Sequence, residues 1–118
     1  MVNKDEYMVV GEYCTSERMS LRCNDDSSVI LISKALYGRL HAGRCITSDY
    51  AHALGCYSDV TSYLESVCSG HRECSMLVAT VDSVAQPCPK DFKSYLEVIH
   101  VCAPGEFLFL QARHQLGL

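Results

Sequence analysis

The stretch that decides the fold is Gln86-Pro87-Cys88-Pro89-Lys90-Asp91-Phe92-Lys93-Ser94-Tyr95-Leu96-Glu97-Val98. It places a cysteine between two prolines and leads into residues 95–102, where Leu96, Val98 and His100 share one face of a predicted β-strand. Four other segments are short and rich in alternating or β-branched apolar residues, and they also predict strands: residues 7–10, 18–23, 29–32 and 75–81. The chain is therefore expected to be mainly antiparallel β structure.

One amphipathic helix is predicted over residues 58–67, where Ser58 or Asp59 can cap the N-terminus. Its apolar residues recur at the helical spacing i, i+4, i+7, and they are Val60, Leu64 and Val67. Residues 47–54 predict a second, weaker helix. The expected fold class is α+β, a compact antiparallel β structure with one or two helices.

Cysteine is the outlier of the composition, with eight among 118 residues, all between Cys14 and Cys102. The tight C-x2-4-C pairs of zinc sites and the C-x-x-C of redox proteins are both absent from the sequence. An even number of widely spaced cysteines predicts four disulfides and therefore an extracellular location. Eight cysteines allow on the order of a hundred pairings, and only Cys68–Cys74 is favoured by a short intervening loop.

Several classes of function are disfavoured by the sequence. A net charge of −4 argues against a nucleic-acid partner, which would require an excess of cations. The longest apolar runs, residues 29–32 and 107–110, are far too short for membrane insertion of this domain. Common catalytic motifs are missing and the five histidines are scattered, so we expect no enzyme activity, no cofactor and no metal.

Three segments, in order along the chain, resemble one known family. Residues 35–39, Ala-Leu-Tyr-Gly-Arg, resemble the ANYGR motif of sea-urchin-egg-lectin-type (SUEL) lectin domains, which bind rhamnose and galactose. Residues 86–98 resemble the family's DPCPGTYKYLEV block, and residues 68–78 are similar to its short C-x5-C loop. The cysteine order matches over residues 7–103, which we interpret as a SUEL-type lectin domain. Residues 104–118 are expected to be a tail, a linker or a remnant of the expressed fragment.

The resemblance implies both a covalent framework and a binding site. The implied disulfides are Cys14–Cys45, Cys23–Cys102, Cys56–Cys88 and Cys68–Cys74. The implied site is a shallow monosaccharide site formed by three loops. In the family, an acidic residue after the first cysteine, the tyrosine of ANYGR, and the aspartate, glycine and lysine of the DPC block contact the sugar.

Transferred to this chain, the resemblance gives six candidate ligand-binding residues: Tyr37, Arg39, Gln86, Lys90, Lys93 and Glu17. The ring of Tyr37 can cover a sugar face and its hydroxyl can form a hydrogen bond. Lys93 keeps the family's Cys-x4-Lys spacing and can donate to vicinal hydroxyls. Arg39 also matches, although the alternative is that residues 37–39 only hold a turn, with Gly38 at positive φ.

The chain also departs from the family pattern. Thr15 follows the first cysteine, with Glu17 two places later, and Gln86 and Lys90 replace the family aspartate and glycine. Ser94 is an insertion. Two charged acceptors are therefore lost, and charged acceptors make the stronger hydrogen bonds. The donors Lys90 and Lys93 favour a polar, anionic saccharide over a neutral deoxy sugar, so we expect altered sugar specificity.

These observations favour an extracellular, non-catalytic carbohydrate-binding module whose partner is a carbohydrate or a glycosylated extracellular protein. The alternative is a protein–protein adhesion module of a cell-surface receptor, with a decayed sugar site and a protein receptor as partner. A disulfide-rich protease inhibitor is supported by cysteine density alone. For the lectin, Tyr37, the loop at 86–93 and the turn at 15–17 are expected to meet at one end of the β structure.

Overall fold

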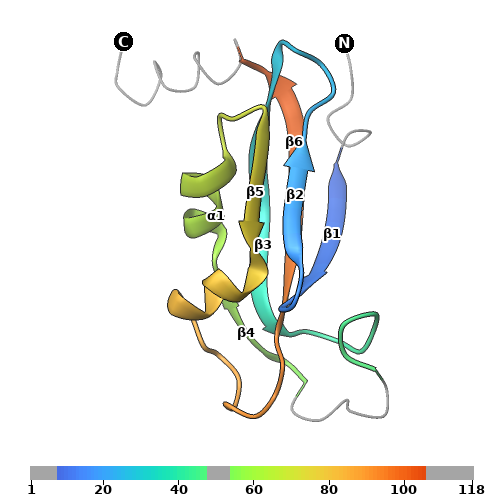
Figure 1. Cartoon of the computed structure of the whole chain (residues 1–118), viewed down its shortest axis with the longest axis vertical. Helices are drawn as coiled ribbons and strands as arrows, with labels where there is room; N and C mark the ends of the chain where they lie inside the picture. Colours follow the sequence, from blue (N-terminus) through green and yellow to red (C-terminus); the bar gives the residue numbers. More distant parts are fainter. Residues whose placement is uncertain (1–7, 48–53, 106–118) are drawn as a thin grey trace.

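The computed structural model describes residues 8–47 and 54–105, which form an α+β fold of two antiparallel sheets with an α-helix and a 3-10 helix (Figure 1). The elements are β1 (Val9–Cys14), β2 (Arg18–Arg22), β3 (Ser28–Arg39), β4 (Cys56–Asp59), α1 (Thr61–Cys68), β5 (Glu73–Leu77), the 3-10 helix η3 (Val78–Ser83) and β6 (Tyr95–Pro104). This is the predicted fold class.

The larger sheet has the strand order β1-β6-β3-β4, and the smaller sheet pairs β2 with β5. The smaller sheet lies in front of the larger one in Figure 1, with α1 beside it. The hydrophobic core fills the space between the sheets and contains residues from both, including Met19 of β2, Ile30 of β3, Leu96 of β6 and Leu64 of α1. Strands β2, β3, β5 and β6 therefore turn buried residues toward this core, whereas β1 and β4 contain only half-buried and exposed residues.

The predicted alternation is found in β2 and β6. Met19 and Leu21 of β2 are buried, and the arginines and the serine between and around them are exposed. In β6, Leu96, Val98 and His100 are buried on the same face, as predicted. Apolar residues at a period of two thus turn one face of each strand to the core.

Strand β3 is much longer than the predicted strand at 29–32, since it runs without a break through Tyr37 to Arg39. A register shift between Ile32 and Lys34 lets it continue along β6 instead of ending. Residues 37–39 therefore lie in a strand, and the interpretation that they hold a turn is wrong. Gly38 does have the positive φ that was predicted, 152°, and a Cβ there would also lie 2.2 Å from the carbonyl oxygen of Cys56.

The predicted strand at 75–81 is correct only in its first part. β5 ends at Leu77, and Val78–Ser83 forms η3 instead. Val78 and Val81 are both buried because residues three apart share one side of a 3-10 helix. This change of direction carries Asp82 away from the sheet.

Helix α1 begins three residues later than predicted, because Ser58 and Asp59 lie at the end of β4. The carboxylate of Asp59 accepts a hydrogen bond from the backbone N–H of Thr61 at 2.9 Å, so it stabilises the first turn. The predicted helix at 47–54 falls almost wholly outside the described residues. So do residues 106–118 of the predicted tail, whereas Pro104 is the last residue of β6.

Four disulfides join these elements, with the pairing that the resemblance implies. Cys23–Cys102 connects the two sheets, and Cys68–Cys74 connects α1 to β5. Cys14–Cys45 and Cys56–Cys88 each fasten a long connection to the end of a strand. Within residues 8–47 and 54–105, no helix has the length and apolar character needed to cross a membrane.

Candidate functional site

A hollow of about 390 Å³ opens beside the connection between η3 and β6, which forms the lower end of the molecule in Figure 1. Its wall is formed by residues from four parts of the chain, namely Thr15, Tyr37, Asp82, Gln86 and residues 88–94. Thr15 follows β1, Tyr37 lies in β3 and Asp82 lies in η3. The fold thus brings Tyr37 and the loop at 86–93 to one hollow, and of the predicted turn at 15–17 only Thr15 lies in its wall.

Four of the six candidate ligand-binding residues line this hollow: Tyr37, Gln86, Lys90 and Lys93. Gln86 and both lysines are exposed, so their polar groups are available to a ligand. Asp91 is also in the wall and exposed. The other two candidates, Arg39 and Glu17, are not part of the wall.

Tyr37 does not act as an aromatic platform, because its side chain is fully buried at 0% exposure and belongs to the hydrophobic core. The expectation that its ring covers a sugar face is therefore wrong. Its contribution is the hydroxyl, which donates a hydrogen bond of 2.6 Å to Oδ1 of Asp82. Burial, together with this bond, raises the pKa of the Tyr37 hydroxyl, so the group stays protonated and remains a donor.

Asp82 is the residue of the hollow that the sequence analysis missed. It is exposed, and Tyr37 holds one of its two oxygens from the core side. It therefore supplies a carboxylate to a hollow in which Thr15 and Gln86 stand at the family's acidic positions. The residues 75–81 preceding it resemble a strand, and no feature of the sequence marks Asp82 as the partner of a tyrosine 45 positions away.

Arg39 supports the hollow from beneath. It is only 3% exposed, and its Nη1 donates a 2.6 Å hydrogen bond to the backbone carbonyl of Lys93. Its guanidinium carbon also lies 4.9 Å from the centre of the Phe92 ring, within the range of a cation–π contact. Arg39 lines a separate cavity of about 420 Å³ with Ile46 and Phe92 among its neighbours. It therefore positions the segment that carries Lys93.

The sequence model of the family described as the D-galactoside/L-rhamnose binding SUEL lectin domain matches residues 21–102, which is more than half of the chain. The chain belongs to this family. No curated protein matches it as a relative. The match runs from β2 to the last cysteine of β6 and includes Tyr37, Asp82 and the 86–94 segment. Strand β1 and Thr15 precede it, although β1 pairs with β6 throughout its length.

In this SUEL lectin domain, Glu17 is committed to a structural contact and does not reach the hollow. Its carboxylate forms two hydrogen bonds with Arg44, of 2.6 and 2.8 Å, and accepts a third, of 2.7 Å, from the backbone N–H of Cys14. These contacts, the one with Arg44 first, lower the pKa of Glu17 to about 2. Glu17 therefore does not take over the family's acidic position next to Thr15.

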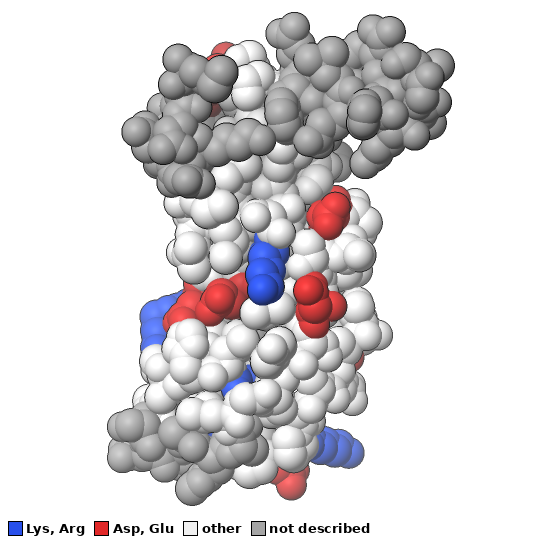
Figure 2. Space-filling view, turned by 180° about the vertical axis from the view of Figure 1, so that it is seen from behind, with Lys and Arg blue, Asp and Glu red and all other residues white. Residues whose placement is uncertain are grey.

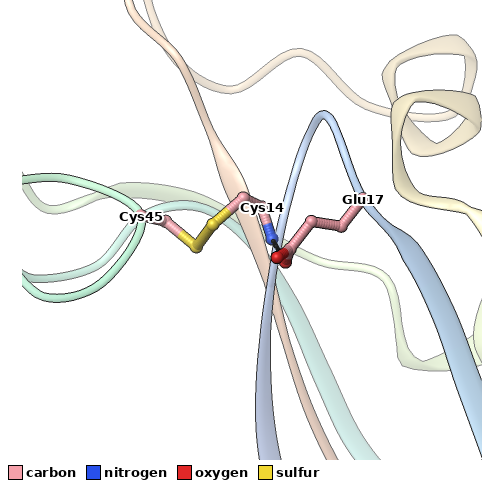
Figure 3. Close-up of side chains that lie close together, drawn as sticks. All are labelled: Cys14, Glu17 and Cys45. Carbon is pink, nitrogen blue, oxygen red and sulfur yellow. Dashed lines mark hydrogen bonds between the residues drawn. A yellow bond between two sulfur atoms is a disulfide. The ribbon is translucent and has the colours of Figure 1, made fainter.

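Figure 3 shows the carboxylate of Glu17 beside the backbone N–H of Cys14, whose side chain forms the disulfide with Cys45. The ion pair between Glu17 and Arg44 and the disulfide fasten the loop after β3 to the turn after β1. The two sulfur atoms are covalently bonded to each other, so this group has no thiolate for a metal ion. The loop is thus held by one covalent and one ionic link.

Proposed function

We propose that this SUEL lectin domain binds, without catalysis, a polar saccharide that carries an acidic group, and that the hollow at Tyr37, Asp82 and residues 86–94 is the binding site. The observation that carries the proposal is the convergence of these distant segments on a single hollow. Membership of a carbohydrate-binding family supports the general class of ligand. The finer specificity follows from the polar groups in the wall.

The acidic group of the ligand is assigned to the lysine side of the hollow. Lys90 and Lys93 are exposed on the same short segment, and each offers three donors. Lys90 replaces a residue that is glycine in the family motif, so it adds a cation where the family has none. A carboxylate or sulfate on the sugar would form charge-assisted hydrogen bonds there, which are stronger than neutral ones.

The hydroxyl groups of the ligand are assigned to Asp82 and Gln86, which also line the hollow. Because the Tyr37 hydroxyl donates to one oxygen of Asp82, the carboxylate is held in place before a ligand arrives. Its second oxygen remains an acceptor for sugar hydroxyls. Asp82 thereby replaces, from a new position, the acceptors that are lost at Thr15 and Gln86.

The cysteines support a non-catalytic role and an extracellular location. Cys88 in the wall of the hollow is bonded to Cys56, so it has no free thiolate to act as a nucleophile. All eight cysteines are paired in four disulfides, which persist in oxidising compartments. The proposed partner is accordingly a free or protein-linked extracellular carbohydrate.

The test is a glycan array with matched neutral and acidic saccharides, followed by NMR titration of the best ligand. Lys93→Ala and Asp82→Asn should each weaken binding by about 1–3 kcal/mol, the effect of losing a charged hydrogen-bond partner. Lys34→Ala is the control, because Lys34 is an exposed lysine of β3 outside the hollow. Equal binding by all three variants would show that the ligand lies elsewhere, and a preference for neutral sugars would overturn the acidic specificity.

One observation favours protein recognition as a second candidate function. β1 is an edge strand of the larger sheet, and Val9 and Val10 on it are 48% and 62% exposed. An exposed edge can accept a strand from another protein. Binding of an extracellular protein by a domain that gives a blank glycan array, with loss of that binding in Val10→Lys, would support the adhesion alternative.

A further inference from the structure

A second group of polar side chains lies outside the hollow, where β1 and β6 meet the loop after β3. It consists of Glu12 of β1, His41 of the loop and Glu97 of β6, and their ligand atoms all lie within 4.8 Å of one another. None of these residues lines the hollow. The three come from distant parts of the sequence, so the sequence analysis had no motif by which to find them.

The two glutamates are a direct cross-strand pair, because Glu12 stands opposite Glu97 in the register of β1 and β6. Glu97 follows the buried Leu96 and precedes the buried Val98, so it lies on the outer face of the sheet. Like charges directly opposite each other destabilise a sheet. A cation bound between the two carboxylates would remove this repulsion.

His41 stands at this pair and is held there. Its Nε2 lies 2.9 Å from Oε1 of Glu12, and its side chain remains 56% exposed. The backbone N–H of His41 donates to the hydroxyl of the buried Tyr95 at 3.2 Å, and the two rings contact edge to face with centroids 5.9 Å apart. The position of the imidazole is thus fixed from the core side, and its ring nitrogen faces the carboxylates.

The neighbouring cation, Arg44, interacts electrostatically with Glu12 but is bound chiefly by another carboxylate. Arg44 donates a hydrogen bond to the backbone carbonyl of Glu12, but its guanidinium is bound in bidentate fashion by Glu17. On the face of the molecule turned away from β2 and β5, charged side chains gather in a band across the middle, with acidic and basic groups next to each other (Figure 2). Among residues 8–47 and 54–105, the side chain that contacts a carboxylate of this pair at hydrogen-bond distance is that of His41, at Glu12.

We propose that Glu12, His41 and Glu97 form a binding site for a zinc ion. One imidazole nitrogen and two carboxylate oxygens are a ligand set that zinc accepts, with water in the fourth tetrahedral position. Calcium fits less well, because it takes six to eight oxygen ligands and no nitrogen. The ion would fasten the loop at His41 to both strands, close to the point where Cys14–Cys45 fastens it covalently.

The test is calorimetric titration of zinc chloride into the disulfide-intact full chain after treatment with EDTA. The expected result is saturable one-to-one binding. His41→Gln and Glu97→Gln should each raise the dissociation constant by about tenfold or more, since even residues outside the ligand shell can change metal affinity by that factor. His71→Gln is the matched control, because His71 is an exposed histidine outside the cluster, and it should leave the affinity unchanged.

Thermal unfolding provides an independent readout. In EDTA, Glu97→Gln should unfold at the same temperature as the parent chain or at a higher one, because the like-charge pair is removed. A hundredfold excess of zinc over the parent's dissociation constant should raise the midpoint of the parent chain by about 4 °C or more, and that of the variant by about half as much or less. Absence of saturable binding, or equal affinity in parent, His41→Gln and Glu97→Gln, would overturn the proposed site.

Discussion

The sheet frame and the binding end of this domain are held in place in different ways. In the frame, β3 and β6 are paired from Ser28–Pro104 to Gly38–Tyr95, and buried apolar residues fill the space between the two sheets. At the binding end, residues 85–94 contain neither helix nor strand and depend on a few separate links, chiefly Cys56–Cys88 and the bond from Arg39 to Lys93. Substitutions in the frame should therefore change the stability of the domain, and substitutions at the binding end should change its affinity for a saccharide. A residue that serves both regions should change both.

Tyr37 is such a residue, and it should give the largest effect. Tyr37→Ala removes a fully buried aromatic side chain from the core and should destabilise the domain by about 3–5 kcal/mol. Tyr37→Phe removes only the hydroxyl that holds Asp82, so it should cost about 1 kcal/mol of stability and weaken ligand binding as well. Urea unfolding and saccharide titration of both variants measure this. A Tyr37→Ala domain as stable as the parent would contradict the buried position of the ring.

The disulfides allow the two regions to be tested separately. Loss of Cys23–Cys102 by double replacement with serine should destabilise the domain by about 2–5 kcal/mol, more than loss of Cys56–Cys88. The reason is that the first closes a separation of 79 residues and the second one of 32. Removal of Cys56–Cys88 should reduce saccharide affinity more than its effect on stability explains, because Cys88 lies in the wall of the hollow.

The reverse order of stabilities, or unchanged affinity without Cys56–Cys88, would show that the binding segment does not depend on its covalent link. Both double variants are measured by denaturant unfolding under oxidising conditions, with the parent chain as reference.

Arg39→Lys tests whether the frame positions the binding end through a single side chain. Lysine keeps the charge but loses the planar fork that reaches the Lys93 carbonyl and lies over Phe92. We expect destabilisation of about 1–3 kcal/mol and faster amide hydrogen exchange in residues 90–94. The exchange rates of β3 and β6 should change less. Uniformly faster exchange over the whole domain would mean that Arg39 supports the core and not this segment.

The smallest expected effect is the acid sensitivity of the contact between Glu17 and Arg44. The pKa of Glu17 is lowered from 4.5 to about 2 on folding, so its stabilising contribution is present above pH 4.5 and is lost as the pH falls toward 2. Glu17→Gln should therefore show a flatter dependence of stability on pH in that range. The effect is small because the pair is exposed and Cys14–Cys45 fastens the same loop. Identical pH profiles for variant and parent would contradict it.

Sequence reasoning predicted the frame well because its signals are local. The alternation of Met19 with Leu21 and of Leu96 with Val98 indicates which faces are buried. It failed where the tertiary structure overrides the local pattern. Val78 and Val81 are β-branched residues that are common in strands, yet they lie in a 3-10 helix. Their spacing of three residues places both of them on its buried side. The continuation of β3 past Ile32 depends on a register shift that no residue type signals.

The site was predictable to a smaller extent. The family resemblance indicated Tyr37, Gln86, Lys90 and Lys93, which do line one hollow. It could not distinguish a residue that contacts a ligand from one that supports the wall. Arg39 is buried beneath the segment and Glu17 is paired with Arg44, and both facts depend on partners far away in the sequence. Asp82 was missed for the same reason, because what marks it is a hydrogen bond from the hydroxyl of Tyr37, which is far away in the sequence.

The bridge between Cys23 and Cys102 also determines how this domain responds to mechanical force. Residues 8 and 105 leave the sheets near the same end, because Val9 pairs with His100 and Gly105 contacts Ser27. Tension applied at these two points would peel β1 from β6 one residue pair at a time. It would then pass along residues 8–23, across the bridge, and out through residues 102–105. Residues 24–101, which hold all of the hollow except Thr15, lie outside that path, so the bridge diverts the force from most of the binding surface.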